Sequence, residues 1–176
     1  MIPKPTNYDS INENGNSSKL PMGGYVCIIR KVTDVPDKKY LELEYDIADG
    51  QYKGIAVDAY EALGKWIHNF RLYYTDKALW RFKKFIVRAE QTNPGFEFDW
   101  GNPQCLVNRG IGMVIGYRQY WKDDGTLKEA LDVQDFCTAT DVREDNLPKS
   151  PECRAPKDPA PVAKVEEIQE ETGLPF

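Results

Sequence analysis

RGIGMVIGYRQYWKDDGTLKEALDVQDFCTA, from Arg109 to Ala139, is the most informative segment of the sequence. At its centre, Asp123-Asp124-Gly125-Thr126 has the composition of a tight turn, because aspartate and glycine tolerate the backbone angles that such turns require. The flanking residues are rich in apolar and aromatic side chains that favour strands. The segment therefore predicts a long β-hairpin whose arms are residues 109–122 and 127–139.

The two faces of the first arm differ in character. Side chains alternate between faces along a strand, so Arg118, Tyr120 and Lys122 share one face with Val114. This face is polar enough to bind a ligand. The opposite face, which is predicted to be core, holds Ile111, Met113, Ile115, Tyr117 and Trp121.

Four further β segments precede the hairpin. Residues 25–35 are β-rich and long enough for a strand. Residues 41–47 alternate apolar side chains with glutamate and aspartate, which predicts a half-buried strand with a wet outer face. Asp49-Gly50 predicts a hairpin turn into a second strand near Tyr52–Val57, and residues 65–74 are another β candidate.

Residues 76–91, DKALWRFKKFIVRAEQ, form the one helix that the sequence predicts clearly. Its apolar stripe at helical spacing comprises Leu79, Phe82, Ile86 and Ala89. Thr75 is the expected N-cap, and Asn93-Pro94-Gly95 ends the helix. A cationic stripe, which is also compatible with an ordinary solvated helix face, comprises Lys77, Arg81, Lys84 and Arg88.

These elements divide the chain into three parts. Residues 1–21 are polar and turn-forming and are predicted to be a flexible arm. Residues 22–140 are predicted to be one mainly β domain, an OB-fold-like (oligonucleotide-binding) small barrel of five strands with one α-helix between the third and fourth. An α+β sandwich is the alternative. Residues 141–176 are rich in proline and charge and are predicted to be a disordered, acidic C-terminal tail.

Charge is distributed unevenly along the chain. The 176 residues have a formal net charge of -5. Residues 53–122 nevertheless carry 11 cations and 6 anions, whereas residues 141–176 carry 5 cations and 9 anions. A basic middle is compatible with nucleic acid despite the net charge. No apolar run approaches the ~18 residues of a membrane span, so we expect no membrane association.

Patterns typical of catalysis or metal binding are scarce. The four cysteines are widely spaced and His68 is the single histidine, which favours mostly buried thiols over a zinc site. Gly110, Gly112 and Gly116 lie inside a predicted strand, so close packing or a bend explains them better than a phosphate loop. No nucleotide-binding or hydrolase motif occurs. We therefore expect a non-enzymatic protein without cofactors or metal, and a small nuclease is disfavoured.

Aromatic and basic side chains are interleaved within the domain. Single-stranded nucleic acid requires this combination, because cations follow the backbone and flat rings stack on bases at ~1–3 kcal/mol each. Tyrosine and tryptophan are also common in strands for packing reasons alone. The candidate nucleic-acid-binding residues are Trp66, Arg71, Tyr73, Lys77, Arg81, Lys84, Arg88, Arg118, Tyr120 and Lys122.

The last ten residues, EIQEETGLPF, combine acid with an apolar end. They resemble the C-terminal tip of bacterial and phage single-stranded-DNA-binding proteins, in which an OB barrel is followed by a flexible linker and an acidic tip. The matching residues are Glu170, Glu171, Leu174, Pro175 and Phe176. Thr172 and Gly173 depart from the uninterrupted aspartates of that family. The resemblance implies that the tip binds partner proteins and competes with DNA for the protein's own cations.

The domain is also similar to a family of phage-encoded proteins of unknown function found beside replication genes. The similarity lies in GGYVCIIRKVTDVPDKKYLELEYDIADGQYKG, KALWRFKKFIVRAEQTNPGFEFDW and YWKDDGTLK. Together the resemblances imply a phage or prophage protein of the host cytoplasm that protects single-stranded DNA in replication or recombination. It would recruit replication or repair proteins through its tip. We expect a homo-oligomer or a cooperative array, because one barrel covers few nucleotides. The alternative is a protein-interaction adaptor that binds no DNA.

Overall fold

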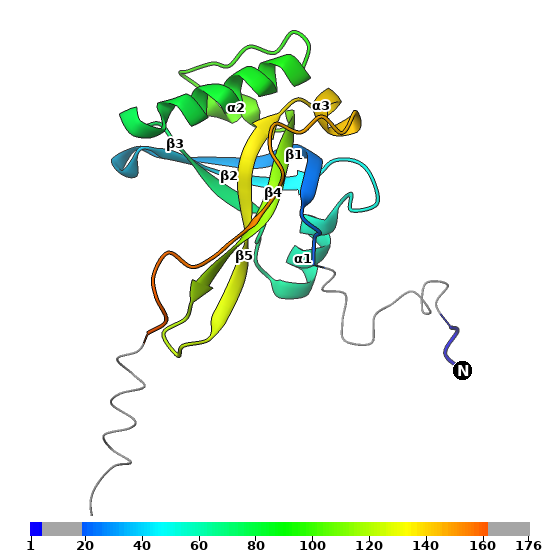
Figure 1. Cartoon of the computed structure of the whole chain (residues 1–176). Helices are drawn as coiled ribbons and strands as arrows, with labels where there is room; N and C mark the ends of the chain where they lie inside the picture. Colours follow the sequence, from blue (N-terminus) through cyan, green and yellow to red (C-terminus); the bar gives the residue numbers. More distant parts are fainter. Residues whose placement is uncertain (5–18, 162–176) are drawn as a thin grey trace, which may run out of the picture.

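The computed structural model describes residues 1–4 and 19–161, and within them six strands form one sheet with three α-helices against it (Figure 1). The strands are β1 (Gly23–Val35), β2 (Tyr40–Ile47), β3 (Asn69–Tyr73), β4 (Gly110–Trp121), β5 (Leu127–Cys137) and β6 (Cys153–Arg154). The helices are α1 (Ile55–Leu63), α2 (Leu79–Thr92) and α3 (Ala139–Arg143), with 3-10 turns η2 (Pro36–Lys38), η3 (Asp76–Ala78) and η4 (Pro103–Leu106). The expected mainly β fold is confirmed.

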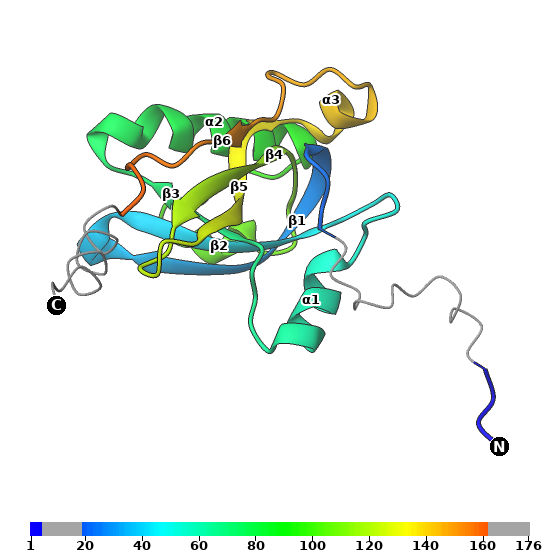
Figure 2. The same cartoon turned by 60° about the horizontal axis from the view of Figure 1, so that its bottom comes forward.

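The sheet has the strand order β3-β2-β1-β4-β5, and each neighbouring pair in this order is antiparallel. The short β6 pairs in parallel with β4 at Tyr117 and Arg118, beyond the residues that pair with β1. Strands β3 and β5 are therefore the two edges, and no strand ladder joins them in the described part of the chain. In Figure 1 the turn between β1 and β2 lies at the upper left and the tip of the β4–β5 hairpin at the bottom, and in Figure 2 both lie on the left.

The long hairpin predicted from the sequence is present. Strands β4 and β5 pair continuously from Trp121–Leu127 to Gly112–Cys137, with one register shift where β5 has an extra residue, Gln134. The turn has Gly125 at a φ of 83°. The Asp124 carboxylate accepts a hydrogen bond from the backbone N–H of Thr126 at 2.9 Å. The turn chemistry read from the sequence is therefore the chemistry that joins the arms.

The first two predicted strands are also confirmed as β1 and β2, whereas the candidate at residues 65–74 is shorter and forms only β3. One residue on the face of β2 that was predicted to be exposed to solvent is buried instead. Asp46 is buried, and its Oδ1 accepts hydrogen bonds from the N–H groups of Ile47 at 2.8 Å and Ala56 at 2.9 Å. A carboxylate at this position satisfies N–H groups at the start of a helix.

The helix that Asp46 caps is α1, so the predicted strand at Tyr52–Val57 is wrong. Gly54 and Gly64 bound α1, with φ values of 80° and 72° in the left-handed region that favours glycine. The run DAYEAL between them consists largely of residues with good helix propensity. A period-2 interpretation of residues 52–57 overlooked this run and the cap from β2.

The predicted helix at residues 76–91 is confirmed as η3 followed by α2, and Asn93 is its C-cap. Thr75 precedes η3 but makes no side-chain capping bond. The buried residues are Phe82, Phe85, Ile86 and Ala89. Leu79, which was assigned to the apolar stripe, is 45% exposed, so the buried stripe includes Phe85 in its place.

The expectation of a disordered tail from Asp141 is wrong for residues 141–161. Helix α3 opens with a capping box in which Thr138 and Asp141 exchange side-chain-to-backbone hydrogen bonds. Further along, the backbone N–H of Tyr117 donates to the carbonyl of Glu152, next to β6. Residues 162–176, and most of the predicted N-terminal arm, lie outside the described residues. Leu20 is buried, so the domain begins before residue 22.

Glycines on β1 and β4 make room for this C-terminal segment. A Cβ on Gly112 would lie 2.5 Å from the carbonyl oxygen of Thr138, and a Cβ on Gly116 would lie 2.3 Å from that of Glu152. These distances are far inside van der Waals contact, so only glycine fits. The expected close packing at these glycines is confirmed, and the segment that packs there is residues 138–152.

The core lies between the curled sheet and α2. Its largest fully buried side chains include Tyr45, Phe85, Phe136, Leu43 and Met113. The Phe85 and Phe136 rings meet edge to face at 5.1 Å, a favourable aromatic geometry. Among the described residues, no helix has the length and apolar character to cross a membrane.

Candidate nucleic-acid interface

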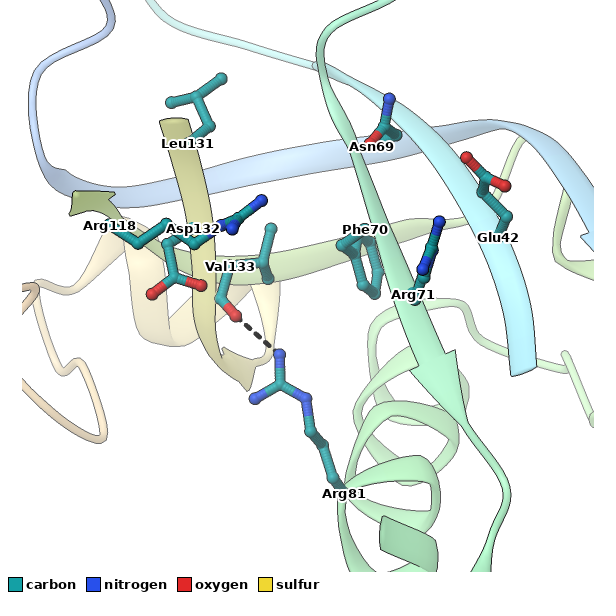
Figure 3. Close-up of a pocket in the computed structure, with 9 residues that line it drawn as sticks. All are labelled: Glu42, Asn69, Phe70, Arg71, Arg81, Arg118, Leu131, Asp132 and Val133. Carbon is teal, nitrogen blue, oxygen red and sulfur yellow. Dashed lines mark hydrogen bonds between the residues drawn. The ribbon is translucent and has the colours of Figure 1, made fainter. Parts of the chain in front are cut away.

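A pocket of about 400 Å³ lies between the free edges of β3 and β5 (Figure 3). It is lined by Glu42, Asn69, Phe70, Arg71, Arg81, Arg118, Leu131, Asp132 and Val133. Three of these side chains are arginines, contributed by β3, α2 and β4, and two are carboxylates. The lining therefore has a net positive charge around the half-buried ring of Phe70, and the arginines were all predicted to be site residues.

On β3, Arg71 and Tyr73 point to the same face because they are two residues apart in a strand. The Arg71 guanidinium lies 4.8 Å from the centroid of the Tyr40 ring, and the Tyr73 ring lies 5.1 Å from that ring. A hydrogen bond to Tyr73 raises the pKa of Arg71 above its ordinary value. Tyr73 is 38% exposed, so this edge offers a cation and a ring to solvent.

Arg81 reaches from α2 to the free edge of β5 (Figure 3). Its Nη2 donates to the Val133 carbonyl at 2.6 Å and its Nη1 donates to the Gln134 carbonyl at 3.4 Å. Its guanidinium lies 4.8 Å from the centroid of the Phe136 ring. Burial lowers the pKa of Arg81, an effect that the nearby carboxylates of the hairpin oppose. Arg81 therefore takes the place of a neighbouring strand along this part of β5.

A second pocket, of about 560 Å³, adjoins the first along the β4–β5 hairpin and shares Arg118 and Asp132 with it. The predicted residues Tyr120 and Lys122 line it. Tyr120 is 41% exposed, and Lys128 stands opposite it on β5. We call the two adjoining pockets together the β3–β5 groove.

The second pocket also contains cations that sequence reasoning missed. Arg154 and Lys157 line it, but both lie in the segment that was assigned to the disordered tail. The Arg154 side chain is within 3.6 Å of Asp132 and 3.0 Å of Glu152. The indole N–H of Trp121, expected in the core, instead donates to the carbonyl of Asp158 at 3.1 Å. Proline-rich composition masks this packing, and no local signal in the sequence identifies it.

Trp66 does not line the groove. Its indole N–H donates to the backbone carbonyls of His68 at 2.9 Å and Tyr45 at 3.2 Å. Its ring lies 6.0 Å from that of Tyr60, on α1. These contacts attach the segment before β3 to β2, so Trp66 has a structural role in the described fold.

The cationic stripe predicted on α2 is divided among different partners. Lys84 forms an ion pair with Asp135 of β5 at 2.6 Å. Arg88 donates to Gln91 within the same helix at 2.7 Å, and Lys77 is exposed in η3. Only Arg81 of this stripe lines the groove.

His68 is buried at the entrance to β3. Burial lowers the pKa of His68, so the neutral imidazole is favoured, in contact with the Tyr45 ring at 5.5 Å. Within residues 1–4 and 19–161, no cluster of three or more histidine, cysteine, aspartate or glutamate side chains is suited to hold a metal ion. The predicted partner tip, Glu170 to Phe176, lies outside the described residues.

Comparison with known proteins does not assign the chain to a family. No protein-family model matches it, and no curated protein is significantly similar to it. Function must therefore be argued from the groove itself.

Proposed function

We propose that this protein binds single-stranded DNA and that its sheet is an open OB-type barrel. Five strands curl until the edges β3 and β5 line one pocket, and a helix follows β3 along the chain. OB folds are partly open five-stranded barrels that bind oligonucleotides near the β1–β2 and β4–β5 loops. The observation that carries the proposal is the β3–β5 groove, where arginines from three elements line one pocket and the exposed Tyr120 lines the pocket beside it.

The groove suits a single strand better than a duplex. Arg71 and Arg118 can contact phosphates on either side of the pocket, while Tyr120 in the groove and Tyr73 on the adjoining edge of β3 offer rings to unpaired bases. In a duplex the bases are already stacked and paired, so the rings gain no partner. The carboxylates of Glu42 and Asp132 also line the groove and limit the number of phosphates that can bind there.

The wider role is part of the same proposal. The protein protects exposed strands during phage or prophage replication or recombination in the host cytoplasm, as a homo-oligomer or a cooperative array. The tip, residues 170–176, recruits replication or repair proteins. Both the resemblance of this tip and the similarity of the domain support this context, and no step requires a catalytic residue or a cofactor.

Fluorescence anisotropy with labelled oligo-dT and a matched duplex tests the proposal. We expect tighter binding to the single strand and an affinity that falls with salt, with a slope of about 0.7 per phosphate contact on a logarithmic scale. Equal affinity for duplex, or binding insensitive to salt, would contradict the proposed groove.

Point variants locate the site. Tyr120→Ala should weaken oligo-dT binding by ~1–3 kcal/mol without lowering the melting temperature. Tyr60→Ala is the matched control, because Tyr60 is a similarly exposed tyrosine at 49% on α1, away from the groove. Equal losses from both variants would show that the effect is not specific to the groove.

A protein-interaction adaptor is the second candidate, and the outer face of α1 favours it. Val57, Tyr60, Leu63 and the nearby Ile67 are between 37% and 58% exposed. Such a face is typical of a protein contact. The anisotropy experiment separates the candidates, because an adaptor leaves both oligonucleotides unbound.

A further inference from the structure

Trp80, on the first turn of α2, is a large aromatic side chain that the core does not use. It is 67% exposed, and its indole has no ring partner among the residues that the structure describes. From the sequence alone, packing against the core would explain a tryptophan in this helix. Because Trp80 is largely exposed, packing against the core does not explain it.

The surroundings of Trp80 are basic. Lys77 precedes it by three residues and Lys83 follows it by three, a spacing that places side chains on neighbouring parts of a helix surface. Both lysines are exposed, and neither forms an ion pair within residues 1–4 and 19–161. Asp76 is the one acid nearby in the sequence. This surface therefore joins a ring that contacts no other ring to two lysines and one aspartate, which leave it with a net positive charge.

Two residues of α2 close to Trp80 in sequence contact β5, the strand at one edge of the β3–β5 groove. Arg81, the next residue, lines the pocket and bonds to β5 (Figure 3). Lys84, one turn after Trp80, is paired with Asp135 of that strand. Trp80 directly precedes Arg81 in α2, so a strand of nucleic acid that leaves the pocket beside Arg81 can reach its ring.

We propose that the N-terminal half of α2 is a second subsite for single-stranded DNA, in which a base stacks on Trp80 while Lys77 and Lys83 contact the adjacent phosphates. This subsite rests on the proposed function and extends the groove onto the helix. The combination of a free ring and cations is the combination that single strands bind.

The chain offers a matched control in Trp100. It is 71% exposed, but its ring is stacked on Phe82 at 5.6 Å and meets Phe98 at 5.1 Å. Its close neighbours in the sequence, Glu97 and Asp99, are acids that repel phosphates. Exposure is therefore nearly equal at the two tryptophans, while the local charge has opposite sign.

The experiment measures the affinity of wild type, Trp80→Leu and Trp100→Leu for two oligo-dT lengths, about 6 and about 20 nucleotides, since OB folds cover about 4–16. Trp80→Leu should weaken binding of the longer oligonucleotide about fivefold or more and leave the shorter one within about twofold. Trp100→Leu should change neither. Lys83→Gln should lower the salt slope for the longer oligonucleotide by about 0.7.

Each other outcome overturns the subsite. Wild-type affinity of Trp80→Leu for the longer oligonucleotide refutes it, and so does an equal loss in Trp100→Leu. If Trp80→Leu affects only the capture of a protein partner, the surface binds protein and the proposal is wrong. Failure of wild type to bind either oligonucleotide refutes the proposed function itself. This result differs from one that refutes only the subsite on α2, in which wild type binds both oligonucleotides. Trp80→Leu should melt with wild type, because its ring is exposed and contacts no other ring, whereas Trp100→Leu loses its contacts with Phe82 and Phe98 and should melt lower. Affinities are therefore compared at a temperature at which both variants are folded.

Discussion

Replacing Arg81 with methionine tests whether this arginine completes the edge of the sheet. Methionine keeps an unbranched apolar stem but removes the guanidinium. The change leaves the Val133 carbonyl without the donor that lies 2.6 Å away and removes the cation over the Phe136 ring. A hydrogen bond to a charged group contributes about 1.5–3 kcal/mol, and a desolvated cation–π contact contributes about 2 kcal/mol. The cost of burying the charge offsets part of this sum.

We therefore expect Arg81→Met to lower the free energy of unfolding by about 2–3 kcal/mol, with a melting temperature lower by roughly 5–10 °C for a domain of this size. Urea titration and thermal circular dichroism measure the two quantities. Arg88→Met is the control, because the hydrogen bond that Arg88 makes within the described part of the chain goes to Gln91 on its own helix, and its expected effect is within about 0.5 kcal/mol. Equal stability of Arg81→Met and wild type would refute the assigned role.

Three further predictions concern packing, pH and the tip. Gly116→Ala should destabilise the fold strongly, because its Cβ would lie 2.3 Å from the Glu152 carbonyl, whereas Gly23→Ala, whose nearest atom is 3.7 Å away, should be tolerated in thermal melts. Burial lowers the pKa of His68 below 6.5, so the unfolded chain binds the proton more readily and the free energy of unfolding should fall as the pH decreases below 6.5. His68→Phe should flatten this pH dependence in urea titrations. Parallel pH profiles for wild type and the variant would contradict the prediction. Deleting residues 174–176 should leave oligo-dT binding intact or slightly tighter and abolish partner recovery in pull-downs, so identical partner sets would remove the recruitment role.

Local patterns in the sequence predict the elements that depend on local interactions. The hairpin follows from its turn residues and alternation, and α2 follows from apolar residues at helical spacing. Elements that depend on distant contacts were missed. Helix α1 is capped by Asp46 from β2, and the segment after Asp141 packs where Gly112 and Gly116 leave space. Composition alone cannot show that a proline-rich segment has such a surface to lie on.

The residues of the candidate site also fall into those that a local pattern identifies and those that depend on distant contacts. Arg118, Tyr120 and Lys122 line the groove, but so do Gln119 and Trp121 from the opposite face of β4, so alternation along the strand does not by itself select the groove residues. The helical stripe on α2 was less informative, because the spacing of cations does not show which of them a neighbouring strand engages. Lys84 is paired with Asp135, so the two charges largely cancel.

Arg81 differs from Lys84 because its acceptors are uncharged. Backbone carbonyls satisfy the guanidinium but do not neutralise it, so Arg81 retains its positive charge at the wall of the groove while it holds β5. Arg81→Lys therefore separates the two roles. It keeps the charge but cannot reproduce the planar, two-donor geometry, so it should lose most of the stability that Arg81→Met loses and less of the DNA affinity. If the two variants bind oligo-dT equally weakly at temperatures where both are folded, geometry rather than charge is what Arg81 contributes to the groove.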